Sequence, residues 1–192
     1  GAVAKDEIIS VGGHLDSWDV GEGAHDDGAG VIHSLEALRL LKASGYKPKH
    51  TLRCVWFMNE ENGNRGGLAY ASRADSLKEK HIAAVESDRG GFAPEAFSVD
   101  GNDKIIQELQ SFLPKLNETE VTEIYAGYGG VDISPLKNYY PKITLFGLVP
   151  NPQRYFDFHH AETDVFEAVN ERELALGAAA LALFLQELDK KL

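Results

Sequence analysis

Acidic side chains and histidines gather where three apolar segments of this sequence end. Residues 8–11, 50–58 and 82–85 have the composition of buried strands. Carboxylates follow each segment, in the loop that comes after it, and a histidine follows the first. The side chains concerned are His14, Asp16, Asp26, Glu60, Glu61 and Asp88. Histidine and carboxylate donors with no cysteine nearby are the ligands of a catalytic zinc or a similar divalent ion. The sequence therefore predicts a metal centre.

The number of acidic groups favours a shared site over separate structural roles. One acid after a strand is usually a helix cap or a turn residue. Three sets of acids at equivalent strand ends point to one crevice, because sites form at the carboxyl ends of strands in an open α/β sheet. Crowded negative charges are costly unless a cation neutralises them.

Two metal ions suit this set of donors better than one. A single catalytic zinc takes about three protein ligands plus water, whereas a bridging carboxylate between two ions is typical of hydrolytic two-metal sites. Neighbouring residues in an extended or turning segment point in different directions. One member of the Glu60-Glu61 pair can thus bind a metal while the other acts as general base on a water molecule. By the same logic, one of His159 and His160 binds a metal and the other packs or is solvated.

The sequence lacks the motifs of several other kinds of site. The single cysteine, Cys54, excludes an internal disulfide and a cysteine-rich zinc site, and its apolar neighbours predict a buried side chain. No nucleophile elbow surrounds a serine, and the glycines do not form a dinucleotide-binding loop. Four further histidines, which do not form a pair like His159-His160, are expected to be ordinary surface or packing residues: His25, His33, His50 and His81.

Strands alternate with helices along the whole chain. The patterns predict strands over residues 8–11, 50–58, 82–85, 96–99, 122–125 and 143–149, and helices over 27–44, 67–75, 104–116, 132–140 and 170–192. This alternation predicts an α/β fold, a three-layer α/β/α sandwich with a largely parallel, mixed central sheet. The length of 192 residues suits a single domain, 1–192.

Charge and hydropathy narrow the range of partners. The formal net charge of −11 argues against nucleic acid and against anionic membrane surfaces. The longest apolar run, 174–185, is too short to cross a bilayer, which needs about 20 residues. The oligomeric state stays open, with a homodimer as one option.

Five motifs carry a resemblance to a known family. They are Gly-Gly-His-Leu-Asp-Ser (12–17), Ala-His-Asp-Asp-Gly-Ala-Gly (24–30), Asn-Glu-Glu-Asn-Gly (59–63), Glu-Ser-Asp (86–88) and His-His-Ala-Glu-Thr-Asp (159–164). In this order they resemble the co-catalytic zinc aminopeptidase and carboxypeptidase family, from about residue 8 to the last helix. The resemblance implies a fold of the zinc-exopeptidase type and an extracytoplasmic location, secreted or periplasmic.

The resemblance also implies a role for each site residue. Two zinc ions per chain are expected, the first held by His14, Asp26 and Asp88 and the second by Glu61 and His160, with Asp26 bridging. Glu60 is expected to be the general base, Asp16 to hydrogen-bond His14 and set its tautomer, and Tyr128 to stabilise the oxyanion. In this family the peptide bond between the two acids at 26–27 is cis.

The expected reaction is hydrolysis of dipeptides or short peptides by a two-metal-activated water with a glutamate base. Three alternatives remain: a general aminopeptidase of the same family, a single-zinc glutaminyl cyclase relative, and a metal-free binding domain. The sequence departs from the family at Met58-Asn59, where relatives carry alanine or threonine-alanine. Larger members also have an N-terminal segment before the first histidine, so we expect a fragment of a longer chain.

Overall fold

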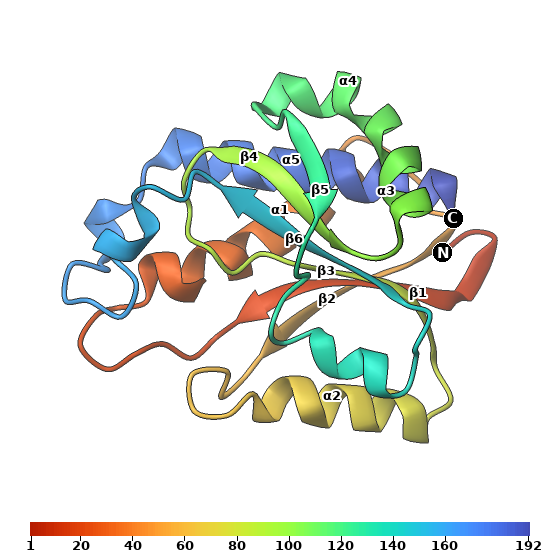
Figure 1. Ribbon diagram of the computed structural model, residues 1–192, viewed down its shortest axis with the longest axis horizontal. Coiled ribbons are helices and arrows are strands. Elements are labelled where there is room, and N and C mark those ends of the chain that lie inside the picture. The colour runs from red at the N-terminus through yellow and green to blue at the C-terminus, as the bar shows by residue number, and fades with distance from the viewer.

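A six-stranded sheet forms the centre of the computed structural model, which describes all residues from 1 to 192 (Figure 1). The strand order is β2-β1-β3-β6-β4-β5. All neighbouring pairs are parallel except β4 with β6, which is antiparallel. The prediction of a largely parallel, mixed sheet is thus confirmed. The strands are β1 (Ala4–His14), β2 (His50–Phe57), β3 (Lys80–Glu86), β4 (Pro94–Asp100), β5 (Glu123–Ala126) and β6 (Thr144–Pro150).

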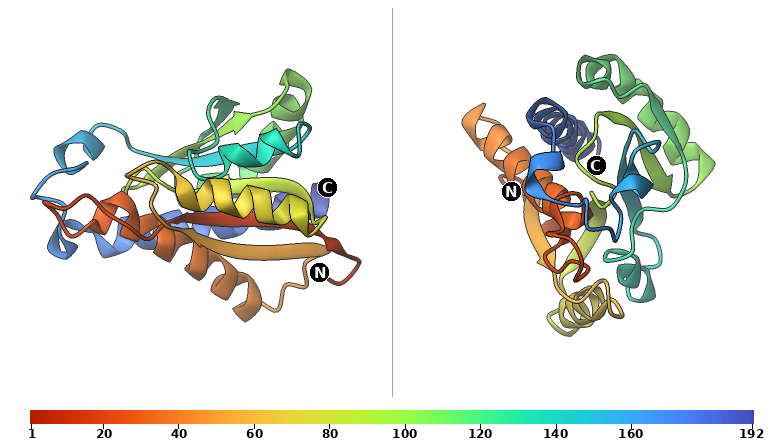
Figure 2. Two further views of the ribbon diagram at one scale, coloured as in Figure 1. Left: turned by 90° about the horizontal axis from the view of Figure 1, so that it is seen from below. Right: turned by 90° about the vertical axis from the view of Figure 1, so that its left-hand side faces the viewer.

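Helices cover both faces of the sheet and make the predicted three layers (Figure 2). The helices are α1 (Ala29–Ala43), α2 (Arg65–Ser76), α3 (Asp103–Leu109), α4 (Leu113–Leu116) and α5 (Glu171–Lys191). On one face α1 packs against α5, and the larger apolar core lies between these helices and the strands. On the other face α2 and a 3-10 helix over Ser134–Asn138 enclose a second, smaller core.

The long helix α5 has clear start and packing signals. The side chain of Asn170 accepts hydrogen bonds from the backbone amides of Arg172 and Glu173, which caps the first turn. Further along, Phe184 is fully buried and stacks on Phe97 of β4 with ring centroids 4.0 Å apart. The cap and the apolar stripe together explain why the predicted helix over 170–192 forms.

The carboxyl end of α5 is tied to the start of β2 by a buried acid. Asp189 accepts hydrogen bonds from the backbone amides of Lys49 and His50, at 2.9 Å each, and from the hydroxyl of Tyr46 at 2.5 Å. The His50 ring also lies 3.0 Å from the same carboxylate. This network lies at the far end of the sheet from the predicted metal centre and positions β2 relative to α5.

Two predicted helices differ from the structure. The helix expected over 104–116 is interrupted after Leu109 by a 3-10 turn and resumes as α4, with Pro114 in its first turn. Proline lacks an amide hydrogen and its ring clashes with the preceding turn, so a continuous α-helix cannot pass through that point. The helix expected over 132–140 is the short 3-10 helix 134–138.

The four histidines assigned to packing are all buried: His25, His33, His50 and His81. The prediction for Cys54 is wrong, because this residue is only half-buried. Its strand, β2, lies at the edge of the sheet and is therefore covered less completely than a central strand. No helix of the structure combines the length and apolar character needed to cross a membrane.

Candidate metal centre

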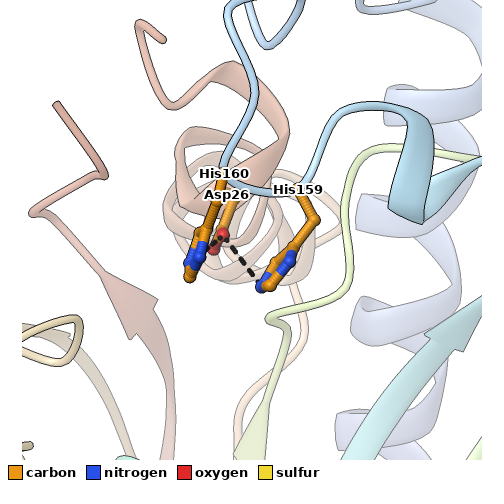
Figure 3. A group of neighbouring side chains, drawn as sticks. All are labelled: Asp26, His159 and His160. Atoms are coloured by element: carbon orange, nitrogen blue, oxygen red, sulfur yellow. Dashed lines mark ion pairs between the residues drawn. The ribbon is translucent and has the colours of Figure 1, made fainter. Parts of the chain in front are cut away.

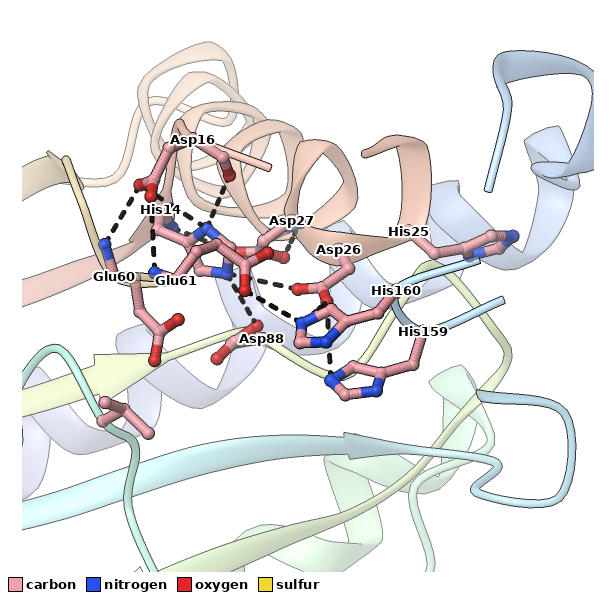
Figure 4. Close-up of polar contacts among 12 residues, drawn as sticks. His14, Asp16, His25, Asp26, Asp27, Glu60, Glu61, Asp88, His159 and His160 are labelled. Carbon is pink, nitrogen blue, oxygen red and sulfur yellow. Dashed lines mark hydrogen bonds and ion pairs between the residues drawn. The ribbon is translucent and has the colours of Figure 1, made fainter. Parts of the chain in front are cut away.

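The parallel register brings the acidic strand ends together. In β1, His14 is aligned with Phe57 of β2, and Gly12 is aligned with Glu86 of β3. The loops that follow these three strands therefore start side by side, and their side chains converge as predicted (Figure 4). Residues from four separate parts of the chain meet there, including the histidine pair 159–160.

The first cluster is built around the His14 ring. Its Nε2 atom lies 3.2 Å from an oxygen of Asp26 and 3.3 Å from an oxygen of Asp88. On the other side of the ring, Nδ1 lies 2.8 Å from the backbone carbonyl oxygen of Asp16. A carbonyl oxygen only accepts, so Nδ1 carries the hydrogen. Nε2 is therefore the ring atom that faces the carboxylates and that can bind a metal ion, which would take the place of a proton there.

The second cluster is built around the other oxygen of Asp26. Nε2 of His160 lies 3.4 Å from this oxygen and 2.9 Å from Glu61, and Nε2 of His159 lies 3.6 Å from it (Figure 3). The two imidazole rings stack with centroids 3.8 Å apart, and Trp18 stacks on the opposite side of His160. The geometry thus adds His159, which was expected to pack or be solvated, as a further candidate ligand.

Unpartnered buried atoms indicate that the clusters fit divalent ions. One oxygen of Asp26 and one oxygen of Glu61 are buried without any hydrogen-bond partner. Asp26 faces the first cluster with one oxygen and the second with the other, which is the position of a bridging ligand. Buried polar atoms rarely remain unpaired unless an ion or a water molecule satisfies them. The donor set of imidazoles and carboxylates is the one that zinc accepts.

The electrostatics of the site agree with this interpretation. Burial raises the pKa of Glu60, Glu61 and Asp88, and neighbouring carboxylates raise it further. For His14, burial alone would lower the pKa, but the contacts with Asp26 and Asp88 outweigh burial and raise it. These acids therefore repel one another in the absence of a cation, and bound cations would remove that penalty.

Two acids outside the predicted set fix the backbone around the metal centre. The carboxylate of Asp164 accepts hydrogen bonds from the backbone amides of His25 at 2.6 Å and Asp26 at 3.0 Å. The carboxylate of Asp27 accepts from the amides of His14 at 3.0 Å and Gly30 at 2.9 Å. The peptide bond between the acids at 26 and 27 is cis, as the resemblance implied. Both acids lie within the quoted motifs, but only the contacts show their function.

Asp16 makes a different contact from the expected one. Its carboxylate was expected to hydrogen-bond His14, but the nearer oxygen is 3.9 Å from the ring nitrogen, and the backbone carbonyl makes the bond instead. The carboxylate accepts from the backbone amides of Glu60 at 3.1 Å and Glu61 at 3.3 Å. The side chain of Asp16 points away from the His14 ring, so the backbone carbonyl of Asp16 is the group nearer to the imidazole. The carboxylate of Asp16 therefore fixes the backbone of Glu60 and Glu61.

Tyr128 lies on the wall of a cavity of about 430 Å3 that Asp88 also lines. Its side chain is half exposed, and burial of the remainder raises the pKa of its hydroxyl. Tyr155 lines the same cavity and is more deeply placed; burial and the surrounding carboxylates raise its pKa strongly. The structure thus places a second tyrosine, which the sequence did not single out, beside the site.

Two further buried acids adjoin the centre. The carboxylate of Glu86 accepts from the backbone amides of Val131 at 2.8 Å and Ile133 at 3.0 Å, which fixes the loop between them. Both carboxylate oxygens of Asp132, in that loop, are buried without a partner, and burial raises the pKa of Asp132 to about 8. Asp132 lies in a segment, 131–133, that shares in the family resemblance, but no role was expected for it from the sequence.

Comparison with known proteins assigns the chain to a class of hydrolases. Residues 2–185 match Peptidase family M28. The chain belongs to this peptidase family. The resemblance described from the motifs is thereby confirmed, and so is the fold that it implied.

Individual relatives agree with the family assignment. The chain is 36% identical to carboxypeptidase Q of Mus musculus over 188 residues, which is 95% of this chain and 38% of that protein. A peptidase M28 precursor from Shewanella amazonensis superimposes with a TM-score of 0.88 at 31% identity, covering 98% of this chain and 43% of that one. A zinc aminopeptidase from Bacillus subtilis superimposes at 0.73 with 22% identity, covering 95% and 46%. The chain thus spans less than half the length of these relatives.

Proposed function

We propose that this chain is the catalytic domain of a zinc-dependent exopeptidase that hydrolyses dipeptides or short peptides. The observation that carries the proposal is the pair of clusters that share Asp26, whose second oxygen is buried and unpartnered. Membership of Peptidase family M28 supports a peptidase, and the relatives include proteins named carboxypeptidase and zinc aminopeptidase.

The proposed ligands follow the two clusters. His14, Asp26 and Asp88 would hold one zinc ion, and Glu61 and His160 would hold the other, with Asp26 between them. When bound, the two ions would lower the pKa of a water molecule and polarise the carbonyl of the scissile peptide bond.

The remaining residues orient groups and move protons. Glu60 would take a proton from the nucleophilic water and deliver it to the leaving amine. Burial and the charge of Asp88 raise the pKa of Glu60, which suits a group that must both accept and donate. Asp16 would fix the backbone of Glu60 through its amide. Tyr128, on the cavity wall, would stabilise the negative charge that develops on the carbonyl oxygen.

The proposal extends to partners and location. A short peptide is the proposed partner, with no role for nucleic acid or a membrane surface, as the net charge of −11 supports. An extracytoplasmic location is proposed with the family resemblance, and the Shewanella relative, described as a precursor, supports it.

The proposal is tested by measuring zinc and peptide hydrolysis on the same sample of intact protein. We expect two zinc ions per chain and cleavage of dipeptides. In Glu60→Gln we expect unchanged zinc content and a loss of about 100- to 10,000-fold in kcat, the usual contribution of a general base. No zinc and no cleavage after zinc addition would refute the proposal and favour a metal-free binding domain. One zinc ion with cyclisation of N-terminal glutamine would favour a glutaminyl cyclase.

A further inference from the structure

A cavity of about 430 Å3 opens beside the first cluster, and Asp88 forms part of its wall. This volume lies within the usual range for small-ligand sites, about 300–1,000 Å3. Segments after β3, β5 and β6 contribute its walls, so the cavity lies at the same edge of the sheet as the metal centre. A peptide whose scissile bond lies at Asp88 would therefore extend into this cavity.

Arg89 is the one basic side chain that lines the cavity. It is half-buried, and its guanidinium group makes no hydrogen bond and no ion pair with any residue. Arg65 and Arg73 also make no side-chain hydrogen bond or ion pair, but both are exposed to solvent. The remaining arginines pair with glutamates; the guanidinium of Arg53, for example, makes two hydrogen bonds to Glu79 at 2.8 and 3.0 Å. Arg89 is thus the one arginine that is both half-buried and unpaired, and it lies beside a site rich in acids.

The chemistry of this group defines its natural ligand. A guanidinium presents five donors in a planar fork, stays charged at all physiological pH values, and binds carboxylates through two parallel hydrogen bonds. The carboxylates of the metal centre do not pair with Arg89, so a carboxylate from outside the chain is the group that would satisfy it. Peptide substrates carry such a group at the C-terminus.

Arg89 directly follows the proposed metal ligand Asp88, and both residues line the cavity. A carboxylate bound by Arg89 would therefore lie in the same cavity that Asp88 borders on the side of the metal centre.

Apart from Glu86 and Asp88, the other walls of the cavity are mainly apolar, and several aromatic side chains in them are exposed. Phe156 is 77% exposed, Tyr128 48% and Tyr125 38%, and Leu148 and Pro150 complete the apolar lining. Aromatic side chains around a concave site bury a large apolar area when a ligand enters. An apolar side chain is therefore the best match for this part of the cavity.

We propose that Arg89 binds the carboxylate of the C-terminal residue of a peptide substrate, while the apolar walls take the side chain of that residue. This inference rests on the proposed peptidase function and makes the activity that of a dipeptidase or carboxypeptidase. An acidic side chain carries the same carboxylate chemistry, and the choice of peptides below distinguishes the two sources.

The test compares four peptides on intact, zinc-loaded protein: Ala-Leu, Ala-Leu-amide, Ala-Glu-amide and Ala-Gln-amide. We expect wild-type protein to prefer Ala-Leu over its amide by about 10- to 100-fold in kcat/KM, the effect of losing a charge-assisted hydrogen-bonded pair. In Arg89→Gln this ratio should fall toward one, mainly through KM, and Arg89→Lys should retain part of it. The matched control is Arg65→Gln, an exposed arginine outside the cavity, which should leave the ratio at the wild-type value.

A binding measurement separates substrate recognition from turnover. In the Glu60→Gln background, Ala-Leu should bind about 10- to 100-fold more weakly when Arg89→Gln is added, with zinc content unchanged in both proteins. Equal cleavage of Ala-Leu and its amide, or a ratio unaffected by Arg89→Gln, would overturn the inference while leaving the peptidase proposal intact. A preference for Ala-Glu-amide over Ala-Gln-amide that depends on Arg89 would support carboxylate binding but assign it to a side chain. Failure of all four peptides to bind or react would refute both proposals.

Discussion

Replacement of Asp16 by asparagine tests how the structure positions the proposed general base. The carboxylate of Asp16 accepts one hydrogen bond from the amide of Glu60 and one from the amide of Glu61. In Asp16→Asn one of the two acceptor oxygens becomes an NH2 group, which faces an amide donor. The contact with His14 is made by the backbone carbonyl of residue 16, and the substitution leaves that carbonyl in place.

The size of the effect follows from the number of hydrogen bonds lost. A hydrogen bond to a charged group contributes about 1.5–3 kcal/mol, and Asp16→Asn removes one of them. If this free energy is lost from the orientation of Glu60 in the transition state, kcat falls by about 10- to 150-fold. Asp16→Ala removes both bonds and should lower kcat further.

The assay measures kcat with a dipeptide and zinc per chain on the same preparations. We expect the first cluster to keep its zinc in Asp16→Asn, because the His14 ring is held by the main chain. Asp19→Asn serves as the matched control, since Asp19 is an exposed acid in the same loop. It should match wild type in both measurements.

Two results would refute the reasoning about Asp16. Wild-type kcat in Asp16→Ala would show that the two amide contacts do not position Glu60. Loss of zinc from the His14 cluster in Asp16→Asn, with Asp19→Asn unaffected, would show that the carboxylate holds the imidazole after all, as the family resemblance implied.

Three further predictions concern the metal centre and the fold. Asp26→Asn should reduce zinc from two ions per chain to one or none by metal analysis, because Asp26 faces both clusters; two retained ions would contradict a bridging role. Asp189→Asn should lower stability to urea by about 2–4 kcal/mol near pH 7. Burial alone would raise the pKa of Asp189, but its hydrogen bonds outweigh burial and lower it. The stabilisation that the ionised Asp189 provides is therefore fully present above the unfolded-state pKa of about 3.9. It is lost as the pH falls through the folded-state pKa. A difference between variant and wild type that grows on acidification would contradict this sign. Gly30→Ala should destabilise the protein by about 3 kcal/mol or more in urea unfolding, since the added Cβ would lie 1.8 Å from the carbonyl oxygen of Ser87; a neutral effect would show that this close approach is not required.

The central sheet and the convergence of the acids could be predicted because they depend on local patterns. Apolar runs of strand length separated by helical periodicity specify an α/β sandwich. Once the strands are parallel, short loops after β1, β2 and β3 must start at one edge. His14, Glu60 and Asp88 therefore come together in the structure as expected.

Breaks within elements were harder to predict. Residues 104–116 carry a continuous apolar stripe, yet α3 ends at Leu109 and a 3-10 turn precedes α4. The stripe reports which face is buried, whereas the geometry of each turn depends on Pro114 and on how the segment packs against α5 and β5.

The sequence by itself determined the class of site: which donors exist, that they lie at strand ends, and that they suit zinc. The tertiary structure decided what each side chain touches. Asp16 reaches amides 44 and 45 residues away, and Asp164 reaches amides 138 and 139 residues away. It also decided that His159 lies near Asp26 and that Arg89 has no partner. The physical reason is that periodicity depends on neighbours along the chain, whereas contacts between distant residues depend on strand register, loop course and burial together.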